Sequence, residues 1–308
     1  MKNKIDIVYT WVDGSDQKWL AKKTKFQSKM LKNYSQLESF STVNGRFRDN
    51  QELKYSLRAL EKFFPEHGKI FLVTDYQIPS YINPEKIHLI FHEQIMENLP
   101  TFSSKKIESN LFKIPNLSEK FLYFNDDVFI GPQFSLDDYF EEDIPIILYE
   151  QLSNFSDEES HINAIQISKN FLLNKYHNAQ NFQKAMSHSP KIVHKKLFQE
   201  FIQEFPHIYD LCQKEIFREN HVPSFLSDAY YRWLDIKGLG KRKILSSKYY
   251  QTKTNIKEQK ISQLIQDFYQ LHYFCINDTS DNDDQDSNLI LLRETLELLF
   301  PEKSQYEK

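Results

Sequence analysis

The amino-acid sequence predicts an α/β fold, with a mainly parallel, twisted sheet in its first half and a helical second half packed on that sheet. Up to about residue 150, short apolar runs rich in β-branched and aromatic residues alternate with amphipathic helical patterns. Beyond that point helical periodicity dominates, and neither an internal repeat nor a low-complexity linker separates the halves. We therefore expect two parts, residues 1–150 and 151–308, in one compact unit.

Five apolar segments in the first half are predicted strands. They are residues 5–12, 70–75, 87–92, 120–130 and 144–149. Residues 17–41 are Lys-rich and amphipathic, which predicts a surface helix and a loop. The next helix is predicted to start with a capping box, in which Asp49 is the N-cap and Glu52 the third helical residue. A further helix is expected after Ser103.

The second half is predicted to be mainly helical. Helical patterns cover residues 162–176, 192–205, 225–236, 258–271 and 289–300. One short apolar segment, residues 274–278, is a predicted strand that ends in Asn277 and Asp278.

The composition is that of a folded protein and gives no reason to expect a nucleic-acid partner. Hydrophobic residues make up 40% of the 308 residues, and the net charge is −4. The two cysteines, Cys212 and Cys275, offer neither a disulfide framework nor zinc-ligand spacing. Without a signal peptide or an apolar run near the ~20 residues of a membrane span, we expect a cytoplasmic protein. Peripheral association with the inner face of the membrane stays open.

The predicted strand at residues 120–130 contains three consecutive polar residues, Asn125, Asp126 and Asp127. Two adjacent carboxylates are costly within a buried strand unless a positive charge compensates them. Aspartate oxygens are hard ligands that suit Mg²⁺ or Mn²⁺, and such ions bind the phosphates of nucleotides. A metal site at a strand end is therefore one interpretation, and an ordinary Asn-Asp turn is the other.

Other side chains suited to phosphate chemistry are scattered along the chain. Asp13 and Asp16 follow the first strand, where α/β nucleotide-binding domains place their ligands, although Asp-Gly is also a common turn. His188 lies in a Ser-His-Ser-Pro loop, from which an imidazole can reach a cleft or lie at the surface. Arg218 can bind phosphate oxygens in a bidentate manner, or form a surface salt bridge, for example to Glu219.

Several segments together resemble the four conserved regions of the Stealth family. The first region is resembled by residues 5–16 (IDIVYTWVDGSD). The second is resembled by residues 46–58 (RFRDNQELKYSLR), 73–80, 99–104, 107–108 and 121–127 (FLYFNDD). The stretch that begins with residues 188–190 and ends with residues 205–206, together with residues 217–218, resembles the third region. Residues 275–278 (CIND) resemble the fourth. The four regions follow the family's order and cover nearly the whole chain.

The family includes bacterial polysaccharide phosphotransferases and the α/β subunit precursor of the animal lysosomal-enzyme N-acetylglucosamine-1-phosphotransferase. The resemblance implies a Rossmann-like or GT-A-like sheet that binds a UDP-sugar. It also implies transfer of a hexose-1-phosphate, such as GlcNAc-1-phosphate, to a sugar hydroxyl, with release of UMP. Because this chain lacks the long insertions of the animal proteins, a bacterial cell-surface polysaccharide is the expected acceptor.

Family positions carried over by the resemblance give a set of candidate site residues. Asp127, His188 and Arg218 match positions regarded as catalytic or phosphate-binding, with Mg²⁺ or Mn²⁺ held by Asp127 and helped by Asp126 or Asp278. His188 is either the general base on the acceptor hydroxyl or a hydrogen-bond donor to phosphate. Arg58 and Glu108 match motif positions and are expected to bind substrate. Asp13 and Asp16, at the end of the first strand, are expected to contact the nucleotide or the metal.

Two other functions use the same features. A metal-dependent GT-A-like glycosyltransferase would use the same donor but release UDP, and a sugar-binding protein of a polysaccharide assembly complex would be inert. The phosphotransferase interpretation makes a geometric prediction: Asp127, His188, Arg218 and Asp278 should converge on one cleft.

Overall fold

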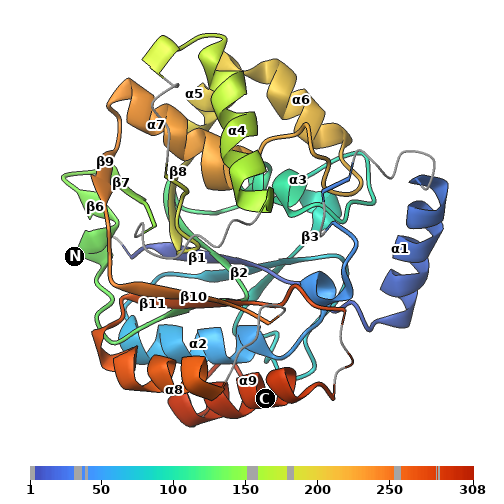
Figure 1. Cartoon of the computed structure of the whole chain (residues 1–308), viewed down its shortest axis with the longest axis vertical. Helices are drawn as coiled ribbons and strands as arrows, with labels where there is room; N and C mark the ends of the chain where they lie inside the picture. Colours follow the sequence, from blue (N-terminus) through green and yellow to red (C-terminus); the bar gives the residue numbers. More distant parts are fainter. Residues whose placement is uncertain are drawn as a thin grey trace.

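A five-stranded sheet lies at the centre of the computed structural model, which describes residues 4–30, 37–38, 41–150, 159–178, 184–252, 258–281, 283 and 285–308 (Figure 1). The strands, in sheet order, are β3 (His88–Phe91), β2 (Ile70–Thr74), β1 (Asp6–Thr10), β4 (Lys120–Asn125) and β8 (Lys191–His194). The first four run parallel, and β8 pairs with β4 in the antiparallel sense. The predicted α/β class with a mainly parallel sheet is confirmed.

Two smaller sheets and two groups of helices complete the fold. One small sheet contains β10 (Ser247–Gln251), β11 (Tyr273–Asn277) and β5 (Val128–Ile130), and the other contains β6 (Phe140–Glu141), β7 (Ile144–Leu148) and β9 (Lys241–Lys243). The α-helices are α1 (Gln17–Met30), α2 (Glu52–Phe63), α3 (Ser104–Glu108), α4 (Glu159–Leu173), α5 (Lys195–Glu204), α6 (Pro206–Lys214), α7 (Tyr231–Lys237), α8 (Glu258–Asp267) and α9 (Ser287–Leu299). Shorter helical turns include the 3₁₀ turns η2 (Asn44–Phe47) and η4 (Leu111–Lys113) and the π-helix η7 (Phe225–Tyr230).

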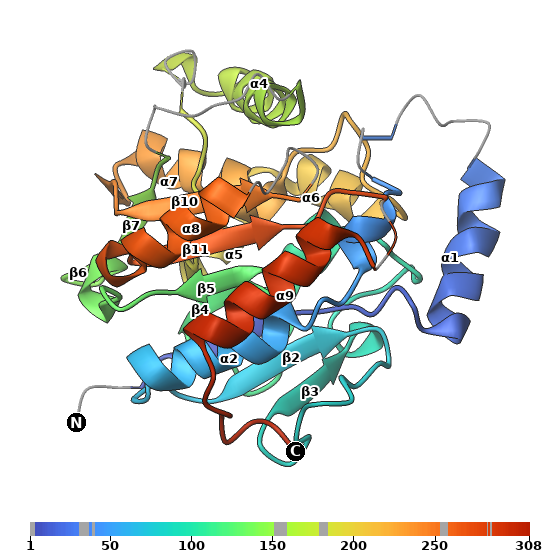
Figure 2. The same ribbon diagram turned by 60° about the horizontal axis from the view of Figure 1, so that its bottom comes forward.

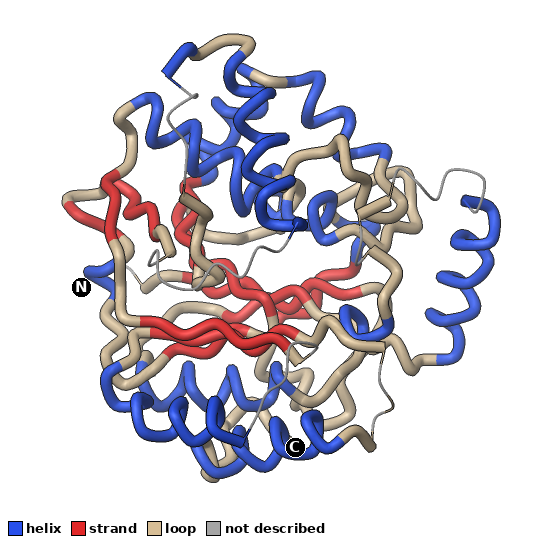
Figure 3. The backbone as a smooth tube through the Cα atoms, viewed as in Figure 1, coloured by secondary structure: helices blue, strands red, loops and turns tan. Residues whose placement is uncertain are grey.

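The central strands are apolar because both faces of their sheet are covered. Ile7 and Tyr9 of β1 pack into one hydrophobic core, and Val8 between them packs into a second core on the opposite face. Helices α2, α8 and α9 lie below the sheets and α4 to α7 above them, so that the strands form the middle layer (Figures 1 and 3). Helix α1 stands at the side of the molecule in both ribbon views (Figure 2).

The prediction of one strand over residues 120–130 is wrong, because the chain changes sheets in the middle of this run. β4 ends at Asn125, and β5 begins at Val128 and pairs with β11. Asp126 and Asp127 form the turn between the two sheets, which places both carboxylates at a strand end.

Two helix predictions need correction. The capping box is not formed: α2 begins at Glu52, and its N-cap is Gln51 in the left-handed region, with φ 66°. Asp49 Oδ1 accepts the Gln51 N–H at 2.8 Å, and Glu52 Oε2 accepts the Asn50 N–H at 2.7 Å, so both carboxylates stabilise the turn before the helix. The helix expected after Ser103 ends at Glu108, and the 3₁₀ turn η4 follows it.

The second half contributes strands as well as helices. The helix predicted over residues 192–205 begins at Lys195, because the residues before it form β8 and pair with β4. Strands β9 and β10 were not predicted either. The loop expected up to residue 41 lies partly outside the described residues. Across the described part of the chain, no helix has the length and apolar character needed to cross a membrane.

Candidate active site

A cavity of about 170 Å³ opens at the carboxyl ends of the parallel strands. It is lined by residues 10–12 at the end of β1, Val73 of β2 and residues 125–127 at the end of β4. The strand order reverses between β1 and β4, since β2 and β3 lie on one side of β1 and β4 on the other. Open α/β sheets bind their ligands at such a reversal, outside the carboxyl ends of the strands.

Asp126 and Asp127 form the acidic wall of this cavity. Burial, together with the charge of Asp127, holds the pKa of Asp126 well above its usual range. Burial also raises the pKa of Asp127 to about 6, although a hydrogen bond with Cys275 acts in the opposite direction. Cys275 Sγ lies 3.4 Å from Asp127 Oδ2, whereas Asp127 Oδ1 is buried and has no hydrogen-bond partner among the described residues. The charges of Arg46 and Arg218 offset only part of the effect of burial on Asp127, so two adjacent buried carboxylates favour a positively charged ligand.

The carboxylate pair fits a divalent cation that a substrate helps to hold. The described residues contain no cluster of three or more His, Cys, Asp or Glu side chains arranged to bind a metal. A third protein ligand is not required, because Mg²⁺ in nucleotide sites is usually held by one or two carboxylates together with substrate phosphates. Bound between Asp126 and Asp127, Mg²⁺ or Mn²⁺ would neutralise charge on those phosphates. The metal itself stays a prediction.

Three arginines, Arg46, Arg48 and Arg218, form a basic wall in the same cavity. The Nε atoms of Arg46 and Arg218 are buried and have no hydrogen-bond partner among the described residues. The sequence pattern identified only Arg218 of the three. Nothing local distinguishes a cavity arginine from a surface one, and the only available signal was that Arg46 and Arg48 begin a segment that resembles the second Stealth region.

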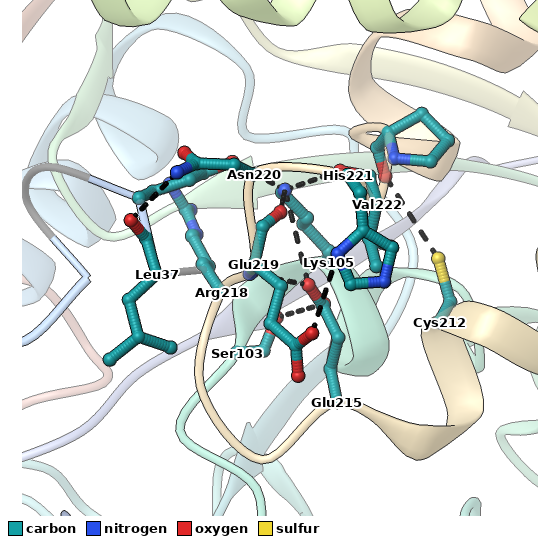
Figure 4. A network of polar contacts seen from close by, with 12 residues as sticks. Leu37, Ser103, Lys105, Cys212, Glu215, Arg218, Glu219, Asn220, His221 and Val222 are labelled. Atoms are coloured by element: carbon teal, nitrogen blue, oxygen red, sulfur yellow. Dashed lines mark hydrogen bonds and ion pairs between the residues drawn. The ribbon is translucent and has the colours of Figure 1, made fainter. Parts of the chain in front are cut away.

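The loop that carries Arg218 is anchored by buried polar contacts (Figure 4). Lys105 Nζ donates to the carbonyl oxygens of Glu219 at 3.0 Å and Val222 at 2.5 Å. Glu215 Oε1 accepts the N–H of Glu219 at 2.8 Å from the start of the same loop. Because these bonds are made to the backbone, they determine where the Arg218 side chain begins.

The Arg218 guanidinium contacts two further side chains. It donates to Ser104 Oγ, and its Nη1 atom lies 3.9 Å from Glu38 Oε2. Glu38 also forms an ion pair with Lys105, so one carboxylate serves two cations. The alternative of a surface salt bridge between Arg218 and Glu219 does not describe this arrangement.

His188 lines the same cavity from the loop that precedes β8. Its ring stacks on Tyr249, with ring centroids 4.7 Å apart. The Tyr249 hydroxyl accepts hydrogen bonds from Asn277 Nδ2 and Gln251 Nε2, each at 3.0 Å. Because Tyr249 is held from two directions, it gives the imidazole a fixed platform facing the cavity.

Asp278 lies behind the cavity wall and supports Arg48. Its Oδ2 atom accepts from Arg48 Nη1 at 2.5 Å, and its Oδ1 atom accepts from Thr252 Oγ1 at 2.6 Å and from the Ser280 N–H at 3.1 Å. Its neighbour Asn277 lines the cavity, whereas Asp278 does not. The structure therefore brings three of the four expected side chains to one cleft and places the fourth one contact away.

Asp13 and Asp16 shape the turn after β1 and do not line the cavity. Asp13 Oδ1 accepts the N–H and the O–H of Ser15 at 2.8 and 2.6 Å. Asp16 Oδ1 accepts the N–H of Trp19 at 2.7 Å, which stabilises the first turn of α1. Both residues stand beside cavity-lining neighbours, Val12 and Trp19.

Arg58 and Glu108 also point elsewhere. Arg58 Nε and Nη2 donate to the Glu307 carboxylate, each at 2.8 Å, and its Nη1 donates to the Phe300 carbonyl at 2.6 Å. Glu108 is buried beside the cavity and accepts from Ser227 Oγ at 2.5 Å. The roles expected for these two residues, as for the cavity residues, stay predictions.

Models of three regions of one family match the chain. Stealth protein CR1, conserved region 1, matches residues 3–30, CR2, conserved region 2, matches residues 46–147, and CR4, conserved region 4, matches residues 270–308. The resemblance of residues 188–218 to the third region stays a prediction.

Curated bacterial proteins are similar over much of the chain. The capsular polysaccharide phosphotransferase fcs1 of Haemophilus influenzae is 33% identical over 292 residues, which are 90% of this chain and 78% of that protein. The capsular polysaccharide phosphotransferase cps1A of Actinobacillus pleuropneumoniae is 41% identical over 189 residues, 58% of this chain and 50% of that protein. The exopolysaccharide phosphotransferase cps2G of Lactiplantibacillus plantarum is 28% identical, over 99% of this chain and 96% of that protein.

Solved structures show a much weaker likeness. The galactosyltransferase LgtC superposes with a TM-score of 0.41 and 10% identity, over 96% of each chain. Mouse xyloside xylosyltransferase 1 superposes with a TM-score of 0.41 and 7% identity, over 89% of this chain and 97% of that one. These values carry no argument about this chain. The matches to the family models and to the Haemophilus protein show that this chain belongs to the Stealth family and is an enzyme of the phosphotransferase class.

Proposed function

We propose that this enzyme transfers a hexose-1-phosphate from a UDP-sugar to a hydroxyl of a cell-surface polysaccharide, forming a phosphodiester and releasing UMP. One observation carries the proposal: two carboxylates, an arginine and a histidine line one cavity at the carboxyl ends of the parallel strands. These are the residues Asp126, Asp127, Arg218 and His188. They are the groups that phosphoryl transfer requires, because the reaction depends on positioning and on charge neutralisation.

The proposed reaction is a displacement at the β-phosphorus of the donor. The acceptor oxygen forms the new P–O bond, and the bond from the β-phosphorus to the bridging oxygen breaks. UMP leaves with the electron pair, and the hydroxyl proton passes to a base. Arg218 binds the oxygens of the transferred phosphate, and Asp126 and Asp127 hold the divalent cation that neutralises the donor's phosphates.

His188 is proposed as the base that accepts the hydroxyl proton. Its imidazole is stacked on Tyr249 and lines the cavity that would hold the phosphates. The alternative role, a charged imidazole that donates a hydrogen bond to phosphate, predicts the opposite pH dependence, since a base must be neutral and a donor of this kind protonated.

The nucleotide product tests the reaction class. The protein is incubated with UDP-GlcNAc, an oligosaccharide acceptor and Mg²⁺ or Mn²⁺, and the nucleotide released is identified by chromatography. We expect acceptor-dependent UMP and a phosphodiester in the product. UDP as the sole acceptor-dependent nucleotide would identify a glycosyltransferase instead.

A matched pair of variants shows whether turnover belongs to this cavity. Asp127→Asn removes a carboxylate from the cavity, whereas Asp267→Asn removes one that pairs with Lys248 at the surface. We expect loss of turnover only in the first variant. Equal turnover in both variants would mean that the carboxylate pair has no part in the reaction.

A further inference from the structure

Arg46 is a cavity residue to which no role has yet been given. Its Nε atom is buried and has no hydrogen-bond partner among the described residues, and the same is true of Arg218 Nε in the same cavity. Leaving a buried charged donor without a partner is costly. Two such donors in one cavity therefore indicate that the cavity binds a group with hydrogen-bond acceptors.

The backbone around Arg46 is held by segments far away in the chain. The 3₁₀ turn η2 is tied down at Gly45, whose N–H donates to the Ser280 carbonyl at 2.9 Å. At its other end, the Phe47 carbonyl accepts the N–H of Gly14 at 2.5 Å. A Cβ atom on Gly45 would lie 2.6 Å from Ser280 O, so glycine is needed for this close approach. The arginine is thus presented to the cavity by a fixed turn, as a residue that positions a ligand must be.

The charges around Arg46 call for an external anion. Burial, followed by the charge of Arg218, lowers the pKa of Arg46 to about 9, and the charges of Glu38 and Asp127 offset part of this effect. Glu38 is shared among Arg46, Arg218 and Lys105, all of which lower its pKa, although its burial acts in the opposite direction. Glu38 is therefore shared by three cations, and of these only Lys105 has a second carboxylate within ion-pair distance among the described residues, Glu215 at 4.0 Å.

The nearby carboxylate of Asp127 does not serve as the missing acceptor. Its buried Oδ1 atom has no hydrogen-bond partner among the described residues, just as Arg46 Nε has none, so the two groups are not bonded to each other. Asp127 Oδ2 is contacted by the thiol of Cys275. The acidic and the basic wall thus face the cavity separately, which suits a ligand that carries both a cation and phosphate oxygens.

We propose that Arg46 and Arg218 together bind one phosphate group, the one that is transferred in the reaction proposed above. Both guanidinium groups line the same cavity, and the charge of Arg218 acts on Arg46, so one phosphate bound by both would neutralise their mutual repulsion. Arg46 is therefore a substrate-contacting residue. This inference rests on the proposed function for the identity of the phosphate but not for its existence.

Binding measurements with UDP and UMP test the proposal. The affinities of the wild-type protein, Arg46→Gln and Arg46→Lys are measured by calorimetry in the presence of Mg²⁺. We expect Arg46→Gln to weaken UDP binding by about 10- to 100-fold, as expected for loss of hydrogen bonds to a charged group. UMP lacks the second phosphate, so its affinity should change by less than about 3-fold. Arg46→Lys keeps the positive charge but loses the planar guanidinium, so its affinity for UDP should lie between those of the wild-type protein and Arg46→Gln.

Arg242→Gln is the matched control, since this arginine is 68% exposed and pairs with Asp235 outside the cavity. It changes the net charge of the protein equally and should leave both affinities unchanged. UDP binding that is unchanged in a folded Arg46→Gln variant would overturn the proposal. Equal weakening of UDP and UMP, together with a lower melting temperature, would also overturn it and assign Arg46 a structural role.

Failure of the proposed function can be told apart from failure of this inference. If the wild-type protein does not bind UDP, the proposed donor is wrong, and inorganic phosphate, which carries no base, becomes the probe. Weaker phosphate binding in Arg46→Gln than in Arg242→Gln would then still support the two-arginine site. Equal phosphate binding in both variants would refute it.

Discussion

Replacing Arg58 with alanine distinguishes a substrate-binding residue from a residue that stabilises the fold. The side chains of Arg58 and Glu307 are each only 5% exposed, so their two hydrogen bonds form a buried ion pair. Removing one partner of a buried pair costs about 3–5 kcal/mol, because the other charge stays buried without compensation. The contact with Glu297, which is 52% exposed, adds little. We expect Arg58→Ala to lower the free energy of unfolding by about 3–5 kcal/mol.

This free energy is measured by urea denaturation followed by circular dichroism, and UDP affinity is measured under conditions where the variant stays folded. Arg242→Ala is the control: Arg242 is 68% exposed, and its buried partner Asp235 keeps the hydrogen bond from the Tyr149 hydroxyl, so we expect a loss of about 1 kcal/mol or less. A double variant, Arg58→Ala with Glu307→Ala, should lose less than the sum of the two single losses, because both remove the same interaction.

The opposite pattern would refute this reasoning. If Arg58→Ala keeps the stability of the wild-type protein but loses UDP affinity, Arg58 contacts the substrate, as the resemblance implied. Its hydrogen bonds to Glu307 and Phe300 would then contribute little to the stability of the fold.

Three further predictions follow from individual contacts. Burial raises the pKa of Glu215 to about 7, so the folded protein keeps a proton that the unfolded chain loses near pH 4. The free energy of unfolding should therefore fall as the pH rises from about 4 to about 7, and denaturation at several pH values should show a weaker dependence for Glu215→Gln. In calorimetry without nucleotide, Asp127→Asn should weaken Mn²⁺ binding by about 10-fold or more. Asp278→Asn should weaken it by less than about 3-fold, because the Asp278 carboxylate bonds to Arg48, and equal losses in the two variants would make Asp278 a metal ligand. If His188 is the base, His188→Ala should lower kcat by about 10²- to 10⁴-fold, and the wild-type rate should rise with pH as the imidazole loses its proton. A wild-type rate that falls with pH would instead make His188 a hydrogen-bond donor to the phosphate.

Local patterns were sufficient for strands that are short apolar runs between turn residues. The strands β1, β2, β3, β7 and β11 lie within two residues of their predicted positions, because a β-branched run between turn residues keeps its character whatever it packs against. The carboxylates Asp126 and Asp127 were found for a similar reason. Two charges inside an apolar run are conspicuous in the sequence itself, and they do lie at a strand end.

Elements that depend on a distant partner were missed or misplaced. β8 is four residues long and reads as the start of a helix, and only its pairing with β4 makes it a strand. The run at residues 120–130 divides because β5 pairs with β11, about 145 residues further along the chain. The residues of a strand do not show which distant segment the strand will pair with.

The sequence by itself determined the fold class, the family and the chemical character of the site: a carboxylate pair at a strand end, a histidine and an arginine. The tertiary structure alone decided which side chains share the cavity. It added Arg46 and Arg48 to the cavity. It also showed that Asp278 supports Arg48 from behind the cavity wall, and that Arg58 pairs with Glu307. The physical reason is that charged side chains take their role from partners brought close by folding, and those partners lie up to 249 residues away in this chain.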